Sequence, residues 1–398
     1  MTQRLDSQAN ATSAPIPGRR LSLFYALYFA LLGCIAPFWG LYLQHREFSP
    51  EHIGWLMAIM ALVRIVAPNV WATWATHFSS ALTLIRWAGF CTLACFSAIA
   101  WLHGFLGMAL VMVGFGFFWS ALLPQYETLT LQAVGRQLDR YGRIRVWGSI
   151  GFIVAVIALG WLFDHVSIAW LPWVMWLIIL GVWLSGWTLT DHSTTEERAQ
   201  RRLPITPLRW NRVFACFIVM TLLLQVSFGP YYTFFSIYLS SLDYPSWSIG
   251  WLWALGVLAE VLLFWRFQRI SHWLSWRSWL LVCLLLTALR WWLIAGWAES
   301  LSWLILAQLV HAFSFAAMHV LAMQFIQGHL PAAQQLKGQA YYSGLGFGLG
   351  SALGAWGSGT LWQVIGAEST FQLAAIIAIL AGLVAWFGLP RDAQTDNK

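Results

Sequence analysis

The sequence SWSIGWLWALGVLAEVLLFWRF runs from residue 246 to residue 267 and decides how the chain folds. It is an apolar segment long enough to cross a lipid bilayer as a helix, which takes about 20 residues. One carboxylate, Glu260, lies near its middle. A charge at this depth costs at least about 2.5 kcal/mol, so acids inside membrane helices mark transport pathways and proton relays. The segment therefore predicts a membrane helix that carries a functional acid.

A similar segment, SPEHIGWLMAIMALVRIV, occupies residues 49–66, which is 196 positions earlier. At this offset Gly54 aligns with Gly250, and Arg64 falls on Glu260. The same offset joins further identical residues, namely Gly33 with Gly229, Tyr42 with Tyr238, Leu43 with Leu239, Gly142 with Gly338 and Gly148 with Gly344. A constant offset over four regions indicates an internal duplication, because insertions would have shifted the register of chance matches. The two halves then carry opposite charges at one equivalent point.

The composition of the chain is that of a membrane protein. Of its 398 residues, 60% are hydrophobic and only 9% are charged, whereas soluble domains have about 25% charged residues. The net charge of +7 resides in a few loops, so it does not indicate a nucleic-acid partner. All five cysteines lie in apolar segments, which predicts buried free thiols and no disulfide.

Twelve apolar segments of about 20 residues predict twelve membrane helices. They are residues 21–42, 52–73, 82–102, 105–126, 146–163, 168–189, 213–239, 246–267, 279–297, 301–327, 341–362 and 371–388. Pro37 and Pro230 predict breaks in the first and seventh of them. The predicted fold is an all-α membrane protein with two pseudo-symmetric six-helix bundles.

The chain is predicted to divide into a first bundle at residues 21–189 and a second at residues 213–388. Residues 190–212 join them and contain DHSTTEERAQRR, a polar stretch that predicts a flexible linker. Residues 1–20 and 389–398 are predicted tails, and the first of them lacks the apolar core of a signal peptide. Because both bundles begin on the same side, they predict parallel repeats with a substrate site between them near the midplane.

Lys and Arg are distributed unevenly between the predicted loops. Of the 22 such residues, Arg46 lies on one side, Arg64 and Arg290 lie inside spans, and the remaining 19 lie on the other side. The basic side of a membrane protein faces the cytoplasm. We therefore expect a multi-pass membrane protein with both termini cytoplasmic.

Ionisable residues concentrate in the second, eighth, ninth and tenth spans. Glu260, Arg290, His311 and His319 are candidates for proton coupling, since a carboxylate can carry a proton and histidine titrates near neutral pH. Each also has a structural alternative: an arginine can form a static pair, and a histidine can bond a backbone carbonyl. Arg64 and Arg290 offer planar donor forks suited to a substrate carboxylate. We expect Arg64 to pair with Glu260 when no substrate is present.

Other polar residues are candidates for substrate binding. Gln225, Gly229 and Tyr232 share one stripe of the seventh span, and Gln308, His311, Phe315 and His319 share one stripe of the tenth. The predicted substrate-binding set is Arg64, Gln225, Tyr232, Gln308 and Trp253. For Trp253 a structural role is the alternative, because tryptophan is common in this chain. Glu127, Arg143 and Arg145 predict a salt-bridged gate on the cytoplasmic side, or else a plain surface pair.

The loops contain no metal-ligand spacing, phosphate loop or nucleophile motif, so no cofactor and no metal are predicted. The segment GLGFGLG at residues 344–350 resembles a dinucleotide fingerprint. No strand precedes it and it lies inside a span, so close helix packing explains it better.

Several segments resemble those of a known family. They are YGRIRVWGS at residues 141–149, GWLWALGVLAEV at residues 250–261, Arg290 with Trp291, and the two histidines of the tenth span. With these segments and twelve spans, the chain resembles the major facilitator superfamily and, within it, the 3-phenylpropionate permease group, which is akin to the lactose permease type of proton symporter. The resemblance implies proton-coupled transport of a small solute.

Likeness to lactose permease implies specific roles. It matches Glu260, Arg290 and His319 to that protein's acid on helix eight, arginine on helix nine and histidine on helix ten. Lactose permease has a further acid one turn after this histidine, and Ala322 stands at that position here. The proton-carrying role would then pass to Glu260. Residues 68–86 also lack the superfamily's Gly, Asp and Arg/Lys loop signature, which puts the usual gating contacts of that loop in question.

The predicted function is proton-coupled uptake of an aromatic carboxylate such as a phenylpropionate-like acid. The predicted partners are a small-molecule substrate, protons and the lipid bilayer, with the chain acting as a monomer. A sugar or nucleoside symporter is the alternative within transporters, with the arginines balancing Glu260 and not touching substrate. An intramembrane enzyme that uses His311 or His319 as a base, or a sensor without transport, is the alternative of another class.

Overall fold

The computed structural model describes residues 18–135, 137–189, 208 and 210–392. Over these residues the secondary structure is helical, without strands. The predicted tails and linker lie mostly outside the described residues. Within them, the all-α membrane fold is confirmed.

The first half consists of six membrane spans. They are formed by α1 (Gly18–Cys34), η1 (Ile35–Trp39) and α2 (Gly40–His45), by α3 (Pro50–Trp74) with η2 (Ala75–His77), by α4 (Ala81–Ser97) with η3 (Ala98–Ala100), by α5 (Gly104–Trp119) and α6 (Leu122–Val134), by α7 (Leu138–Phe163), and by η4 (Ile168–Trp170) and α8 (Leu171–Ser185).

The second half repeats this order. Its spans are formed by α10 (Arg212–Ser227) and α11 (Gly229–Ser241), by α12 (Ser246–Ile270) with η5 (Ser271–Trp273), by α13 (Trp276–Trp297), by α14 (Leu301–Ala312), η6 (Phe313–Ala317) and α15 (Met318–His329), and by α16 (Ala332–Tyr341), η7 (Tyr342–Leu349) and α17 (Gly350–Gly388).

Eleven helical segments of the described residues are long and apolar enough to span a membrane. The last of them covers residues 332–388 and holds two spans, because Gly366 has φ 78° and ψ 176° inside α17. These angles are open to glycine and strained for other residues. The loop predicted at residues 363–370 is therefore helical except at Gly366, and the twelve predicted spans are accounted for.

Five spans of the described residues are interrupted. The eleventh contains the π-helix η7, and the other four form two pairs that are equivalent in the duplication. The first contains the π-helix η1 around Pro37, and the seventh breaks at Phe228, just before Pro230 in the first turn of α11. The fourth breaks at Ser120 and Ala121, and the tenth contains η6 at the equivalent residues 196 positions later. Broken helices at membrane depth are tolerated where they line a cavity or are buried in protein.

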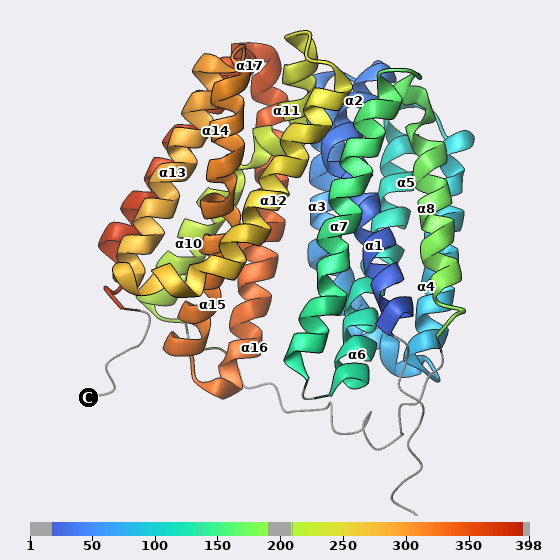
Figure 1. The fold of residues 1–398 in the computed structure, drawn as a ribbon, viewed down its shortest axis with the longest axis horizontal. Helices are drawn as coiled ribbons and strands as arrows, with labels where there is room; N and C mark the ends of the chain where they lie inside the picture. The colour runs from blue at the N-terminus through green and yellow to red at the C-terminus, as the bar shows by residue number, and fades with distance from the viewer. Residues whose placement is uncertain (1–17, 136, 190–207, 209, 393–398) are drawn as a thin grey trace, which may run out of the picture.

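The two halves form separate bundles that lie side by side (Figure 1). Their buried apolar residues form two main clusters. One is drawn from the first half with Phe234 and Ile237 added, and the other is drawn from the second half with Val156 added. The three exceptions lie where the halves meet.

Glycines bring the halves into backbone contact. A Cβ atom at Gly54 of α3 would lie 2.7 Å from the Cα atom of Gly359 on α17, and one at Gly250 of α12 would lie 2.3 Å from the carbonyl oxygen of Val156 on α7. Gly54 and Gly250 are equivalent in the duplication, so the two crossings are symmetric. The carboxylate of Asp164 adds a hydrogen-bonded contact on one side only, accepting from the backbone N–H groups of Ser246 (2.7 Å) and Trp247 (3.1 Å).

Candidate functional site

A buried acid and histidine form the centre of the candidate site. The Nε2 atom of His311 on α14 lies 2.5 Å from Oε1 of Glu260 on α12, and the two side chains are 5% and 13% exposed. Gly256 lies one turn before Glu260 and lets α14 approach, because a Cβ atom there would lie 3.2 Å from the His311 ring. The duplicated segment thus places its acid beside a titratable base.

A fully buried arginine lies in the same part of the second half. Arg290 of α13 donates from Nη2 to Oε1 of Gln308 (3.3 Å), and the hydroxyl of Tyr231 donates to the same oxygen (3.1 Å). The guanidinium carbon lies 4.0 Å from the ring centre of Tyr231 and 4.4 Å from that of Trp291. Aromatic faces stabilise a cation at this distance, most strongly where water is excluded.

Several buried nitrogens of this cluster have no hydrogen-bond partner. They are Nε and Nη1 of Arg290, Nε2 of Gln308 and Nδ1 of His311. A buried donor or acceptor without a partner costs about 1–3 kcal/mol, and such groups are rare in purely structural cores. The cluster is therefore the candidate functional site of the second half.

Arg64 differs from Arg290 in being exposed, although it lies in the middle of α3. The exposed apolar residues Leu62 and Val66 mark the lipid-facing side of this helix, and helical geometry turns Arg64 to the opposite side. Arg64 is therefore exposed on the side of α3 that lies opposite Leu62 and Val66. Arg64 is close enough to interact electrostatically with Tyr28 of the first half and Tyr232 of the second.

The predicted pair between Arg64 and Glu260 is wrong for this conformation, because Glu260 contacts His311. Tyr232 interacts with both charges instead. It is partly exposed and interacts electrostatically with Glu260, Arg290 and Arg64. Tyr232 therefore interacts with charged residues of both halves.

The other predicted substrate residues are not open to solvent. Trp253 donates from Nε1 to Ser236 (3.0 Å) and packs against Tyr231, which are the contacts of a core side chain. Gln308 is fully buried and engaged with Arg290. Gln225 is also buried, but its side chain lines a small cavity. Arg64 and Tyr232 are therefore the predicted residues that a substrate can reach.

The likeness to lactose permease predicts that His319 accompanies Glu260, but in the structure His311 takes that position. His319 hydrogen-bonds the hydroxyl of Tyr342 through Nδ1 (3.2 Å), whereas His311 contacts Glu260. Phe315 of the predicted stripe lies in the π-helix η6 between the two histidines. Its ring stacks on that of His311 with the centres 5.9 Å apart, and it lines one cavity together with His319.

The predicted gate salt bridge is replaced by a cation–π contact. Arg145 of α7 lies over the ring of Phe29 at 4.3 Å and over that of Tyr25 at 5.4 Å. Glu127 interacts electrostatically with Arg145, but the ion pairs of the described residues do not join them. Arg143 is exposed.

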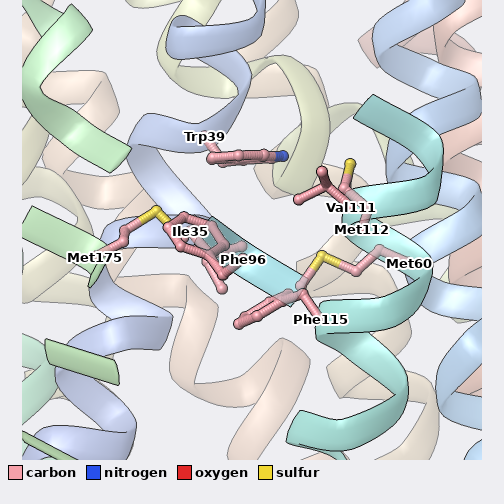
Figure 2. A pocket seen from close by; sticks show the side chains of 8 residues that line it. All are labelled: Ile35, Trp39, Met60, Phe96, Val111, Met112, Phe115 and Met175. Atoms are coloured by element: carbon pink, nitrogen blue, oxygen red, sulfur yellow. The ribbon is translucent and has the colours of Figure 1, made fainter. Parts of the chain in front are cut away.

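An apolar pocket inside the first half contributes no chemistry (Figure 2). It holds about 10 Å³ and is lined by Ile35, Trp39, Met60, Phe96, Val111, Met112, Phe115 and Met175. The indole nitrogen of Trp39 is its one side-chain hydrogen-bonding group and has no partner. Among the described residues, no group of His, Cys, Asp and Glu could hold a metal ion.

Two interrupted six-helix bundles, one with a reachable arginine and the other with a buried acid–histidine pair, define a secondary transporter. The chain belongs to the MFS_1 like family, whose model matches residues 19–373. It is a multi-pass membrane transporter of the major facilitator type and not an enzyme, so the resemblance seen in the sequence is confirmed.

Individual relatives differ in what they transport. The chain is 29% identical over 371 residues to a "Probable 3-phenylpropionic acid transporter" of Escherichia coli (strain K12), covering 91% of this chain and 96% of that protein. It is 28% identical over 371 residues to a "Maltose permease" of Geobacillus stearothermophilus, covering 91% and 93%.

Solved structures share the fold. The nucleoside transporter NupG matches with a TM-score of 0.82 at 18% identity, covering 93% of this chain and 98% of that one. A D-xylose-proton symporter matches with a TM-score of 0.71 at 10% identity, covering 95% and 98%.

Proposed function

We propose that this protein takes up an aromatic carboxylate together with a proton by alternating access. The observation that carries the proposal is the position of Arg64, exposed in the middle of α3 and turned away from the lipid. An arginine fork suits a carboxylate, which accepts two parallel hydrogen bonds from it. Similarity to a probable 3-phenylpropionic acid transporter supports an aromatic acid as the solute.

The proton is carried by Glu260, with His311 as its hydrogen-bonding partner. Tyr232 interacts electrostatically with both Arg64 and Glu260. An anionic substrate bound to Arg64 neutralises the positive charge at one end of this interaction. Substrate and proton then favour each other's binding by one shared coupling free energy, as thermodynamic linkage requires. Arg290 is fully buried. It interacts electrostatically with Glu260 and does not bind the substrate.

The chain is arranged in the bacterial inner membrane as a monomer with both termini cytoplasmic. Bundles at residues 21–189 and 213–388 rock about the outer contacts of Gly54 and Gly250, with residues 190–212 as their connection. The excess of Lys and Arg in the loops on one side supports this orientation.

Transport assays on membrane vesicles test the proposal. Labelled 3-phenylpropionate should accumulate when the vesicle interior is made more alkaline than the medium, and accumulation should collapse when a protonophore is added. Arg64→Gln should abolish uptake. Uptake that equilibrates to the same level with and without the pH gradient contradicts proton coupling.

A sugar symporter is the second candidate, because the maltose permease relative is nearly as similar over the same length. In that case the hydroxyl groups of a sugar would bond Tyr232 and other neutral groups, and Arg64 would only balance Glu260. Competition by maltose and not by 3-phenylpropionate would favour this candidate.

A further inference from the structure

A second cavity lies inside the second half, apart from the Glu260–His311 pair. It holds about 10 Å³ and is lined by residues of the seventh, ninth, tenth and eleventh spans. This volume suits about one water molecule, or one oxygen atom of comparable size. Unlike the apolar pocket of the first half, it has several polar side chains in its wall.

Gln225 is the polar side chain of this wall that has no partner. It is 3% exposed, it lines the cavity, and its amide makes no hydrogen bond among the described residues. The other polar groups are already bonded: His319 to the hydroxyl of Tyr342 (3.2 Å), and Ser314 to the carbonyl of Val310 (3.4 Å). An amide without a partner that opens onto a cavity of one-oxygen size has the features of an unfilled hydrogen-bonding site.

Two phenylalanines form another part of the cavity wall. Phe315 lies in the π-helix η6 and Phe347 in the π-helix η7, and their ring centres are 6.2 Å apart at 90°. Both side chains are only partly buried. π-Helical turns are rare and occur mostly at functional sites, and here each of the two neighbouring spans contributes one ring to the same wall.

This aromatic wall lies next to the helix that carries Arg64. A Cβ atom at Gly348 would lie 2.3 Å from the side chain of Ile65, so η7 and α3 are in contact at the residues adjoining Phe347 and Arg64. The aromatic wall and Arg64 therefore lie on two spans that pack against each other.

We propose that this cavity is a subsite for a hydroxyl group on the ring of the transported aromatic carboxylate. The carboxylate binds Arg64, the ring packs on Phe315 and Phe347, and rotation of these rings admits the hydroxyl oxygen to the amide of Gln225. This inference rests on the function proposed above and narrows its substrate to ring-hydroxylated acids. The substrate hydroxyl binds Gln225 by a hydrogen bond, and no covalent bond forms or breaks.

Competition against labelled 3-phenylpropionate tests the subsite. In the wild-type protein, 3-(4-hydroxyphenyl)propionate should compete roughly three- to tenfold more strongly than unlabelled 3-phenylpropionate, the range expected for one added hydrogen bond. Gln225→Leu, which keeps the side-chain size and removes the amide, should bring this ratio to about one. Gln225→Met serves the same purpose if the leucine variant does not fold. Gln132→Leu, an exposed glutamine at the end of α6, should keep the wild-type ratio.

The outcomes separate the subsite from the function. If the two acids compete equally in the wild type, or if their ratio is the same in Gln225→Leu, the subsite is overturned and carboxylate transport stands. If neither acid competes and Arg64→Gln transports normally, the proposed function fails and the subsite fails with it.

Discussion

His311 and Glu260 belong to different spans of the second half, yet His311 Nε2 lies 2.5 Å from Glu260 Oε1. The fully buried Arg290 lies in the same cluster and keeps two nitrogens without a partner. A carboxylate held by a titratable base, with an unsatisfied cation nearby, has more than one stable arrangement of protons and bonds. This arrangement is what a proton-coupled carrier needs, because its acid must load and release a proton in each cycle.

Replacing the acid should separate proton coupling from substrate movement. Glu260→Gln keeps the shape and a hydrogen-bonding oxygen for His311 but cannot release a proton. We expect it to abolish gradient-driven accumulation of 3-phenylpropionate and to retain exchange of external for internal substrate. Both rates are measurable in the same vesicles. Full accumulation by the variant would show that the proton is carried elsewhere.

Arg64 should discriminate between an acid and its neutral amide. Arg64→Lys keeps the charge and loses the planar fork, so affinity for 3-phenylpropionate should fall about tenfold while affinity for 3-phenylpropionamide changes little. Competition assays give both values. Equal losses for the two compounds would indicate that Arg64 has a structural role.

Asp164 should hold the outer side closed. Asp164 belongs to the first half, and its carboxylate accepts hydrogen bonds from the first two backbone N–H groups of α12 in the second half. The N-cap residue of α12, Pro245, makes no side-chain hydrogen bond to these groups. Asp164→Ala removes this contact and should shift the population toward states in which the outer ends of the bundles are farther apart.

Spin labels on cysteines at positions 101 and 303, both exposed tryptophans in the wild type, report this distance after the five native cysteines are replaced. Glu299→Ala is a matched control, because that acid is exposed and its side chain makes no described hydrogen bond. Identical distance distributions for Asp164→Ala and the wild type would contradict the role of Asp164.

The features that depend on composition and repetition were predictable from the sequence. Apolar runs locate the spans because each must satisfy its backbone inside the bilayer. The 196-residue offset singled out Gly54 and Gly250, and both lie at backbone contacts between the halves. A position that tolerates only glycine is retained in both copies, so the duplication was visible there.

The partners of the charged residues were not predictable in this way. His311 and His319 fall on one stripe of an ideal helix, yet His311 contacts Glu260 whereas His319 hydrogen-bonds Tyr342. The two arginines inside spans look alike in the sequence, but Arg290 is sealed by Tyr231 and Trp291 whereas Arg64 is exposed. Such differences arise from packing between distant segments, which local patterns do not contain.

Proton uptake on substrate binding tests the central claim most directly. Calorimetric titration of the detergent-solubilised protein with 3-phenylpropionate, repeated in buffers of different ionisation enthalpy and at several pH values, measures the protons taken up per substrate bound. We expect uptake of a proton, and an affinity that improves as the pH falls, because a protonated Glu260 no longer repels the anion. Glu260→Gln should bind substrate without proton uptake. Binding to the wild-type protein with no proton taken up at any pH near neutrality would contradict the account and leave Glu260 and His311 as a structural pair.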